Sequence, residues 1–270
     1  MLILAATPIG NIGDASERLR STLESAKVIA AEDTRTLLKL ANHLGIKIAA
    51  ELISLHEHNE LQKLDRLVDI AQTANLVLVS DAGMPTISDP GFALVRACAE
   101  ADIEIQVIPG PSAVIAALAV SGLSTDRFCF EGFLPRKSGE RTRVFEALST
   151  ETRTMIFFES PHRISDSLVD AAKVFGANRK ASVSRELTKK FEETKRGTLS
   201  ELVDWAQDQK GEMVLVIEGA EPVVWNLEDL VSQVIELKAQ GTGLKQAASS
   251  IAKKYGASSS ELYALALKQL

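Results

Sequence analysis

The chain has 270 residues, of which 46% are hydrophobic and 24% charged, and its formal net charge is −6. This length allows two domains and a small third one, and the composition is typical of a globular protein. The two cysteines, Cys98 and Cys129, lie in apolar runs, which excludes a disulfide framework or a cysteine zinc site and favours a reducing cytoplasm. No apolar run approaches the ~20 residues of a membrane span. We interpret residues 1–8 as a first strand that breaks at a proline, and not as a signal peptide.

Short apolar runs alternate with helical patterns over the first 113 residues. The predicted strands are residues 2–6, 28–31, 52–55, 76–80 and 103–108, and the predicted helices are residues 16–25, 34–44, 60–74 and 92–101. This alternation indicates an α/β fold whose parallel-rich sheet is covered on both sides, in an N-terminal αβα domain over residues 1–120. Ligands of such sheets bind beyond the carboxyl ends of the strands.

Residues 121–222 are predicted to form a second αβα domain. Its strands are residues 128–133, 154–158, 181–185, 193–197 and 213–218, and its helices are residues 140–148, 162–175 and 199–207. No helix separates the strand at 181–185 from the one at 193–197, so we expect a mixed sheet rather than a purely parallel one.

The tail, residues 223–270, has a helical pattern only, with helices predicted at residues 227–238, 244–255 and 259–270. The last two, joined at Gly256, fit a helix-turn-helix unit that would place Ser258, Ser259, Ser260 and Lys268 near nucleic acid. They fit a helical hairpin with Leu262, Leu265 and Leu267 in its core equally well. The pattern leaves both interpretations open.

Loops rich in glycine, proline and aspartate follow the first five strands, which indicates a binding rim at one edge of the sheet, although turns commonly contain these residues. The longest is residues 81–91, where Asp89-Pro90 is predicted to open the next helix as cap and first-turn residue. The chain lacks a phosphate-binding P-loop, a dinucleotide fingerprint and a nucleophile elbow. We expect no metal site, because His56 and His58 are two apart and would face oppositely on a strand.

Two segments are locally basic. Residues 134–143 hold four basic side chains and one acidic, and residues 179–196 hold seven basic and three acidic. They could meet a phosphate backbone, or they could be solvated surface segments. In the first of them we predict RNA contacts by Arg136, Lys137, Arg141 and Arg143.

Six segments occur in order within residues 2–219, at 7–11, 31–35, 54–59, 80–91, 107–113 and 158–163. They resemble the signature segments of the ribosomal RNA small subunit methyltransferase I family, in the tetrapyrrole-methylase-like superfamily. The resemblance implies that two αβα domains hold S-adenosylmethionine in the cleft between them. It also implies 2′-O-methylation of a decoding-centre cytidine in the 16S rRNA of the small ribosomal subunit, by a homodimer.

The triplet Gly83-Met84-Pro85 stands where the tetrapyrrole-modifying branch of the superfamily has Gly-Asp-Pro, so the resemblance makes a tetrapyrrole substrate less favoured. Two alternatives to an rRNA methyltransferase remain open. One is a tetrapyrrole-type methylase of a small molecule, and the other is a non-catalytic rRNA-binding factor.

The residue chemistry is compatible with methyl transfer, which needs an apolar wall, backbone donors and a base for the acceptor hydroxyl. The predicted cofactor-binding residues are Pro8, Ala82, Gly83, Met84, Ile87, Ser112, Ala113, Phe158 and Leu187. The predicted catalytic residues are Asp33, Glu159 and Glu186 as candidate bases, and Arg35 and Arg185 as candidate holders of a substrate phosphate. The alternative for each is an ordinary ion pair, such as Asp33 with Arg35.

Overall fold

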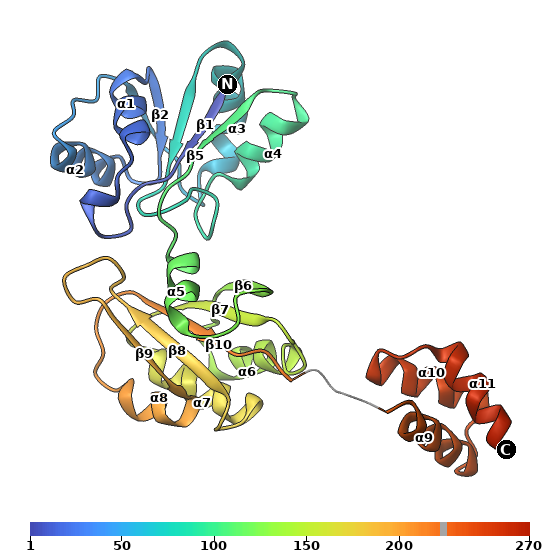
Figure 1. Cartoon of the computed structure of the whole chain (residues 1–270). Coiled ribbons are helices and arrows are strands. Elements are labelled where there is room, and N and C mark those ends of the chain that lie inside the picture. The colour runs from blue at the N-terminus through green and yellow to red at the C-terminus, as the bar shows by residue number, and fades with distance from the viewer. Residues whose placement is uncertain (222–225) are drawn as a thin grey trace. The chain divides into compact units, whose positions relative to one another are not determined.

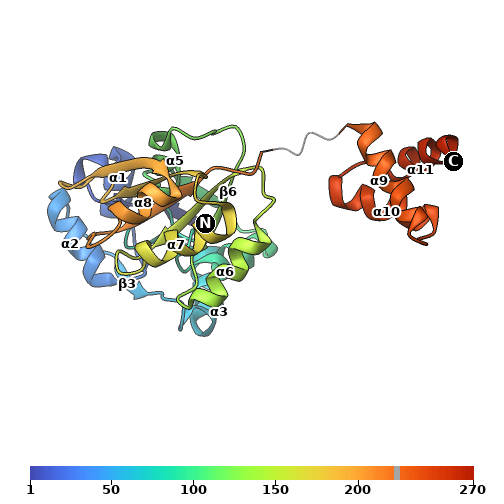
Figure 2. The ribbon, with the colours of Figure 1, turned by 90° about the horizontal axis from the view of Figure 1, so that it is seen from below.

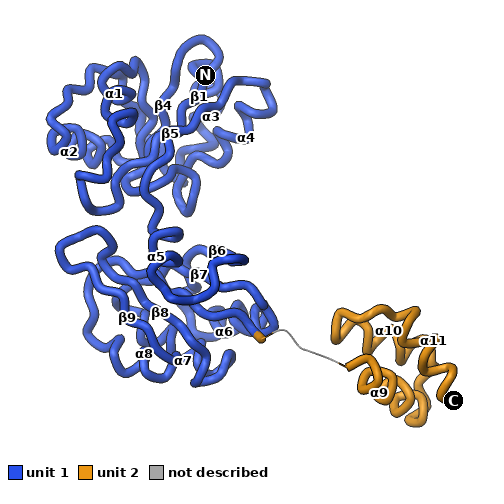
Figure 3. The backbone as a smooth tube through the Cα atoms, in the orientation of Figure 1, with its two compact units in different colours: residues 1–220 blue, residues 221–270 orange. Residues whose placement is uncertain are grey.

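The computed structural model of the chain describes residues 1–221 and 226–270. It divides into two compact units, Met1–Ala220 and Glu221–Leu270 (Figure 3). The domain boundary predicted at residues 222–223 lies outside the described residues. Within the described ranges, no helix has the length and apolar character needed to cross a membrane.

The first unit begins with a parallel five-stranded sheet of order β3-β2-β4-β1-β5 (Figure 1). Its strands are β1 (Leu2–Ala5), β2 (Val28–Ala31), β3 (Glu51–Ser54), β4 (Leu76–Val79) and β5 (Ile105–Ile108). Helices α1 (Glu17–Ser25) and α2 (Thr34–Leu44) cover one face, and α3 (Glu60–Thr73) and α4 (Phe92–Glu100) cover the other. Leu76 and Leu78 pack toward α3 and α4, whereas Val77 and Val79 pack toward α1 and α2, so β4 is apolar at every position.

The second sheet is mixed, as predicted, with the order β6-β7-β10-β8-β9. Its strands are β6 (Phe128–Phe133), β7 (Thr154–Glu159), β8 (Lys180–Arg185), β9 (Glu193–Thr198) and β10 (Met213–Ile217). Strands β6 and β7 are parallel, and the other neighbours are antiparallel. Helices α6 (Ser138–Ala147), α7 (Ile164–Phe175) and α8 (Leu199–Trp205) lie over the same sheet (Figure 2) and share one core with it.

Helix α5 (Ala113–Ser121) covers the opposite face of the second sheet. Val114, Ala117 and Leu118 of this helix pack with Ile156 of β7 and Val216 of β10. Helix α5 therefore packs on the second sheet, whereas the domain boundary predicted at residue 120 places this helix in the first αβα domain. The α/β class and the two sheets with helices on both faces are confirmed.

The structure confirms the predicted helices and strands, and their ends move by at most two residues. Helix α4 begins at Phe92, as predicted, but its predicted cap is wrong, because Gly91 and not Asp89-Pro90 precedes the first turn. The carboxylate of Glu60, at the start of α3, accepts hydrogen bonds from the amides of Gly91, Ala93 and Leu94 at 3.1, 2.9 and 3.3 Å. This side chain from another helix satisfies the amides that a local cap would bind, which leaves Asp89 available for another role.

The second unit consists of α9 (Leu227–Ala239), α10 (Leu244–Tyr255) and α11 (Ser259–Gln269). These helices share a core that includes Val234, Ile251 and Leu262, whereas Leu267 is exposed. The hydroxyl of Ser258 accepts the amide of Glu261 and caps α11. Leu262 is thus a core residue, as the hairpin interpretation requires, but Leu267 is not.

The structure contradicts one of the predicted RNA contacts, that of Arg141. Its side chain is buried in α6, and its guanidinium donates to the buried carboxylate of Asp170 in α7 at 2.6 and 3.0 Å. Burial would raise the pKa of Asp170, but hydrogen bonds from Ser138 and Arg141 outweigh it and lower the pKa. Arg141 therefore joins two helices and is not available to RNA, whereas Arg136, Lys137 and Arg143 are exposed.

We expect Arg141→Met to lower the free energy of unfolding by about 3–5 kcal/mol, because it leaves the Asp170 charge buried without its main partner. Urea denaturation would measure this. Arg143→Met is the matched control, since Arg143 is exposed two residues further on and should change stability by less than about 0.5 kcal/mol. Equal unfolding midpoints for the two variants would contradict the structural role of Arg141.

Candidate functional site

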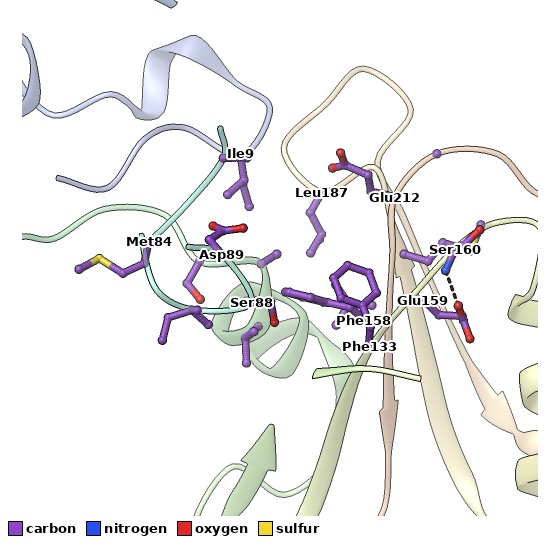
Figure 4. A pocket seen from close by; sticks show the side chains of 18 of the residues that line it. Ile9, Met84, Ser88, Asp89, Phe133, Phe158, Glu159, Ser160, Leu187 and Glu212 are labelled. Carbon is purple, nitrogen blue, oxygen red and sulfur yellow. Dashed lines mark hydrogen bonds between the residues drawn. The ribbon is translucent and has the colours of Figure 1, made fainter. Parts of the chain in front are cut away.

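A cavity of about 360 Å³ opens in the first unit, between loops of the first sheet and the edge of the second (Figure 4). Its volume lies in the range of small-molecule sites. The first sheet and α5 contribute Ile9, Ala82, Met84, Ile87, Ser88, Asp89, Ser112, Ala113 and Val114. The second sheet and its loops contribute Phe133, Phe158, Glu159, Ser160, Pro161, Leu187, Gly211, Glu212, Met213 and Val214.

The strand order explains which loops reach the cavity. Strands β4, β1 and β5 are neighbours, so the loops after them meet although they lie far apart in sequence. Thr7 and Gly83 join two of these loops through reciprocal amide–carbonyl hydrogen bonds of 2.9 and 3.1 Å. The loops after β2 and β3 contribute no lining residue within the described ranges, although the loop after β2 is hydrogen-bonded to the loop after β4.

Aromatic and aliphatic side chains form the wall on the second sheet. Phe158 of β7 stacks at a tilt against Phe133, with ring centroids 5.3 Å apart, and Leu187 faces both rings across the cavity (Figure 4). Phe133 is 61% exposed, so this ring is open to a ligand at the rim. Such a wall offers a planar, partly apolar ligand both burial and ring contacts.

Asp89 places a carboxyl group on the first-sheet side of the cavity (Figure 4). Burial and the nearby carboxylate of Glu32 raise the pKa of Asp89 to about 6, and Asp81 adds to this effect. Glu32 and Asp81 are themselves held in place, because the Asp81 amide donates to Glu32 at 3.2 Å and the Asp33 amide donates to Asp81 at 3.1 Å. Asp89 can therefore exchange a proton close to neutral pH.

Glu159 reaches the cavity, but its carboxylate is occupied by hydrogen bonds. One oxygen accepts the Ser160 amide at 2.6 Å and the Arg163 guanidinium at 2.7 Å, and the other accepts the Ser167 hydroxyl at 2.6 Å. Its side chain is fully buried. These bonds give Glu159 the role of holding the loop after β7, rather than that of a base open to a substrate.

The cavity lining is acidic and apolar. It contains Asp89, Glu159 and Glu212 but, in the part of the chain that the structure describes, no lysine, arginine or histidine. The backbone around it is locally strained, since Thr86, Ser88, Glu186 and Thr188 have φ between 51 and 77°. Such conformations are costly for residues other than glycine and cluster at functional sites.

Most of the predicted cofactor-binding residues lie together. The cavity is lined by Ala82, Met84, Ile87, Ser112, Ala113, Phe158 and Leu187. Pro8 and Gly83 are not lining residues, because the Thr7–Gly83 pairing directs their neighbours Ile9, Ala82 and Met84 toward the cavity instead.

Four predicted catalytic residues lie outside the lining, each in an ion pair. The Arg35 guanidinium donates to the Asp33 carboxylate at 2.6 Å, and these hydrogen bonds lower the pKa of Asp33 to about 2. Arg185 pairs with Glu193 at 2.7 Å. Glu186 pairs with Lys189 at 3.0 Å and accepts the Glu212 amide at 3.1 Å. The ion-pair interpretation thus describes Asp33, Arg35, Arg185 and Glu186 better than a direct catalytic role does.

Several lining residues were missed from the sequence, notably Asp89, Phe133 and the run 211–214. The sequence pattern predicts ligand contacts at the carboxyl ends of strands, but β10 is antiparallel to β7 and pairs Met213 with Glu159. The amino end of β10 therefore lies at the cavity. The signal for Asp89 is its place in the longest loop, although the pair Asp89-Pro90 also predicts a helix cap.

Metal ligation is not apparent at the cavity or elsewhere in residues 1–221 and 226–270, where no group of three His, Cys, Asp or Glu side chains is placed to hold an ion.

Known structures share the fold. The methyltransferase CobJ superimposes with a TM-score of 0.61 at 17% identity, covering 83% of this chain and 96% of that one. Diphthine synthase gives 0.60 at 14% identity, covering 80% and 89%. A Thermus thermophilus uroporphyrin-III C-methyltransferase complexed with S-adenyl homocysteine gives 0.54 at 14% identity, covering 80% and 96%.

Sequence relatives are much closer. Ribosomal RNA small subunit methyltransferase I of Mycobacterium tuberculosis (strain CDC 1551 / Oshkosh) is 45% identical over 265 residues, covering 97% of this chain and 93% of the relative. The enzyme of that name from Escherichia coli O157:H7 is 43% identical over 273 residues, covering 99% and 95%. The family model of tetrapyrrole (corrin/porphyrin) methylases matches residues 1–203. The chain therefore belongs to the tetrapyrrole methylase family and, within it, to the ribosomal RNA small subunit methyltransferase I family.

Proposed function

We propose that the chain is an S-adenosylmethionine-dependent methyltransferase acting on the ribose 2′-hydroxyl of a decoding-centre cytidine in 16S rRNA. The names of relatives that align over nearly the whole chain support methylation of small-subunit ribosomal RNA. The choice of a cytidine 2′-hydroxyl rests on the six signature segments, and the Gly83-Met84-Pro85 triplet disfavours a tetrapyrrole.

The observation that carries the proposal is the charge of the cavity lining. S-adenosylmethionine has a positively charged sulfur, and a nearby lysine or arginine would repel it. The described lining residues include carboxyl groups and apolar side chains but no basic one. This chemistry fits a cationic ligand with a flat apolar part.

The residues present offer a partner to each part of this donor. Phe158, Leu187 and Val214 would bury the adenine ring against the second sheet. Ser112 caps the start of α5, a nine-residue helix whose first amides open at the cavity. A carboxylate is favoured at such a helix terminus, so Ser112 and Ala113 would hold the carboxylate of the methionine portion.

When bound, S-adenosylmethionine supplies a methyl group that an oxygen nucleophile takes by in-line displacement. The protein has to align the acceptor hydroxyl and to accept its proton. Asp89 suits the second task, because it lines the cavity and its pKa of about 6 leaves it mostly ionised at neutral pH. We therefore assign the base to Asp89 in place of Asp33, Glu159 and Glu186.

We expect Asp89→Asn to lower kcat for RNA methylation by at least about 100-fold, the usual effect of losing a general base. In the unchanged protein the rate should rise with pH through about 6, as Asp89 loses its proton. Rate–pH profiles from pH 5 to 8 would measure both effects. Asp65→Asn, which removes an exposed carboxylate from α3, is the control.

The stability of the protein should fall as pH rises through about 6, whereas the methylation rate should increase. A carboxyl whose pKa is raised by folding destabilises the protein as pH rises from about 4 through 6, because the fold favours the protonated form. Asp89→Asn should therefore raise Tm at pH 7 and leave it unchanged at pH 4. If Asp89→Asn keeps its kcat, or loses activity only because the protein unfolds, Asp89 is not the base.

We expect Gly83→Val to weaken S-adenosylmethionine binding about tenfold or more in a folded protein. The φ of Gly83 is +81°, and an added Cβ would lie 3.3 Å from the Ile9 side chain, so the pairing with Thr7 would shift two cavity loops. Calorimetry would give the affinity. Gly45→Val is the matched control, because Gly45 has a φ of +69° with no atom within 4 Å of an added Cβ. Equal affinities in the two variants would refute this role.

The proposed activity is tested by incubating the protein with labelled S-adenosylmethionine and small ribosomal subunits that lack the modification. A 2′-O-methyl group blocks alkaline cleavage of the adjoining phosphodiester, so the label should appear in an alkali-resistant dinucleotide containing cytidine. Label in an alkali-sensitive nucleotide would indicate base methylation. Subunit binding without transfer of label would indicate a non-catalytic factor.

We also predict a homodimer in solution, a cytoplasmic location, and RNA contacts by the exposed Arg136, Lys137 and Arg143. Sedimentation equilibrium at micromolar concentration would test the first of them.

A further inference from the structure

A second, open depression of about 580 Å³ adjoins the cavity. Its lining residues are Gly10, Asn11, Ile12, His43, Thr188, Lys189 and Lys190, and we call it the α2–hairpin groove. Ile9 and Leu187 line the cavity, whereas the residues that follow each of them line the groove. The Asn11 amide donates to the Thr188 hydroxyl at 3.0 Å, so only two touching backbone segments separate the openings.

Helix α2 carries a basic stripe that leads to this groove. Arg35, Lys39 and His43 are four residues apart, so they share one face of the helix and span about 12 Å along it. All three are exposed, and α2 (Thr34–Leu44) contains no acidic residue, although Arg35 is paired with Asp33 at the N-cap. The first 113 residues hold 9 basic and 15 acidic side chains, so this stripe is a local reversal of charge.

The opposite wall of the groove is the connection between β8 and β9, which lies on the same side of the unit as α2 (Figure 1). Lys189 is held by Glu186 at 3.0 Å and Glu212 at 2.9 Å, so it anchors this connection. Lys190 is exposed and has no ion-pair partner among the described residues. Its ammonium lies 5.5 Å from the ring of Phe191, which is 63% exposed.

These features match a single nucleic-acid strand. Spaced basic side chains follow the phosphates of such a strand, and exposed aromatic rings stack on its unpaired bases. The acidic cavity would repel phosphates and admit a ribose, whereas the adjoining groove offers Lys190, which has no ion-pair partner among the described residues, and leads to Lys39 of the stripe. A strand with one ribose in the cavity would therefore place its neighbouring phosphates in the groove.

We propose that the α2–hairpin groove and the α2 stripe bind the RNA backbone beside the target nucleotide, with Phe191 stacking on an adjacent unpaired base. This inference rests on the proposed function, because it requires an RNA substrate. It also gives a role to the second locally basic segment, residues 179–196, which the cavity does not explain.

The test compares Lys39→Gln, Lys190→Gln, their double variant and Phe191→Ala. Filter binding to unmodified small subunits at 50–300 mM salt gives Kd and its salt dependence, and methylation assays give KM. Each lysine variant should reduce the slope of log Kd against log salt by about 0.7, and the double variant by about 1.4. Kd and KM for the double variant should rise about tenfold, and Phe191→Ala should raise Kd at every salt concentration without changing the slope.

Lys27→Gln is the matched control, since Lys27 is exposed just before β2, at the opposite end of the first sheet from the groove. It should leave Kd, its slope and methylation unchanged, and calorimetry should give every variant the S-adenosylmethionine affinity of the unchanged protein. If the double variant matches Lys27→Gln in Kd and slope, the groove does not bind RNA. Subunit binding by an unchanged protein that transfers no methyl group would refute the proposed function, while the slopes would still decide the groove.

Discussion

The pairing of Thr7 with Gly83 is the constraint on which the cavity depends. Two backbone hydrogen bonds join the loop after β1 to the loop after β4, and the lining residues Ile9, Ala82 and Met84 adjoin this pair. The pairing requires a left-handed backbone at residue 83, which glycine adopts without strain. A conformational requirement at one buried position thus determines where three lining side chains lie, although Gly83 itself is not one of them.

The second sheet supplies its side of the cavity by different means. Glu159 is buried and binds Ser160, Arg163 and Ser167, so the loop after β7 keeps one geometry. On the other side, Glu186 and Thr188 hold left-handed conformations around Leu187. Hydrogen bonds and local strain thus position an apolar wall, which is how rigid binding sites are commonly built.

The two openings differ in their charged side chains. Carboxyl groups and apolar side chains line the cavity, whereas lysine and histidine side chains line the adjoining groove, and Lys189 of the groove pairs with Glu212 of the cavity. A methyl donor with a positive sulfur and an RNA strand with negative phosphates need opposite surroundings. Two loops joined by the hydrogen bond from the Asn11 amide to the Thr188 hydroxyl lie between these environments. If the groove binds RNA as proposed, the cation and the polyanion would each avoid like charge.

Local sequence patterns predict the helices and strands, because apolar periodicity and turn residues act over short stretches of chain, and the described elements match within two residues. Six short segments likewise indicate the family, and four of them contribute lining residues, so most of the apolar lining is predictable. Which loops meet depends on contacts between distant parts of the chain. The loop after β2 contacts the loop after β4 without reaching the cavity, so Asp33 and Arg35 lie outside it, whereas the antiparallel β10 brings in Met213. Burial likewise separated Arg141, bound to Asp170, from its exposed neighbours. Strand order, direction and burial arise from contacts between residues distant along the chain, which no local pattern encodes.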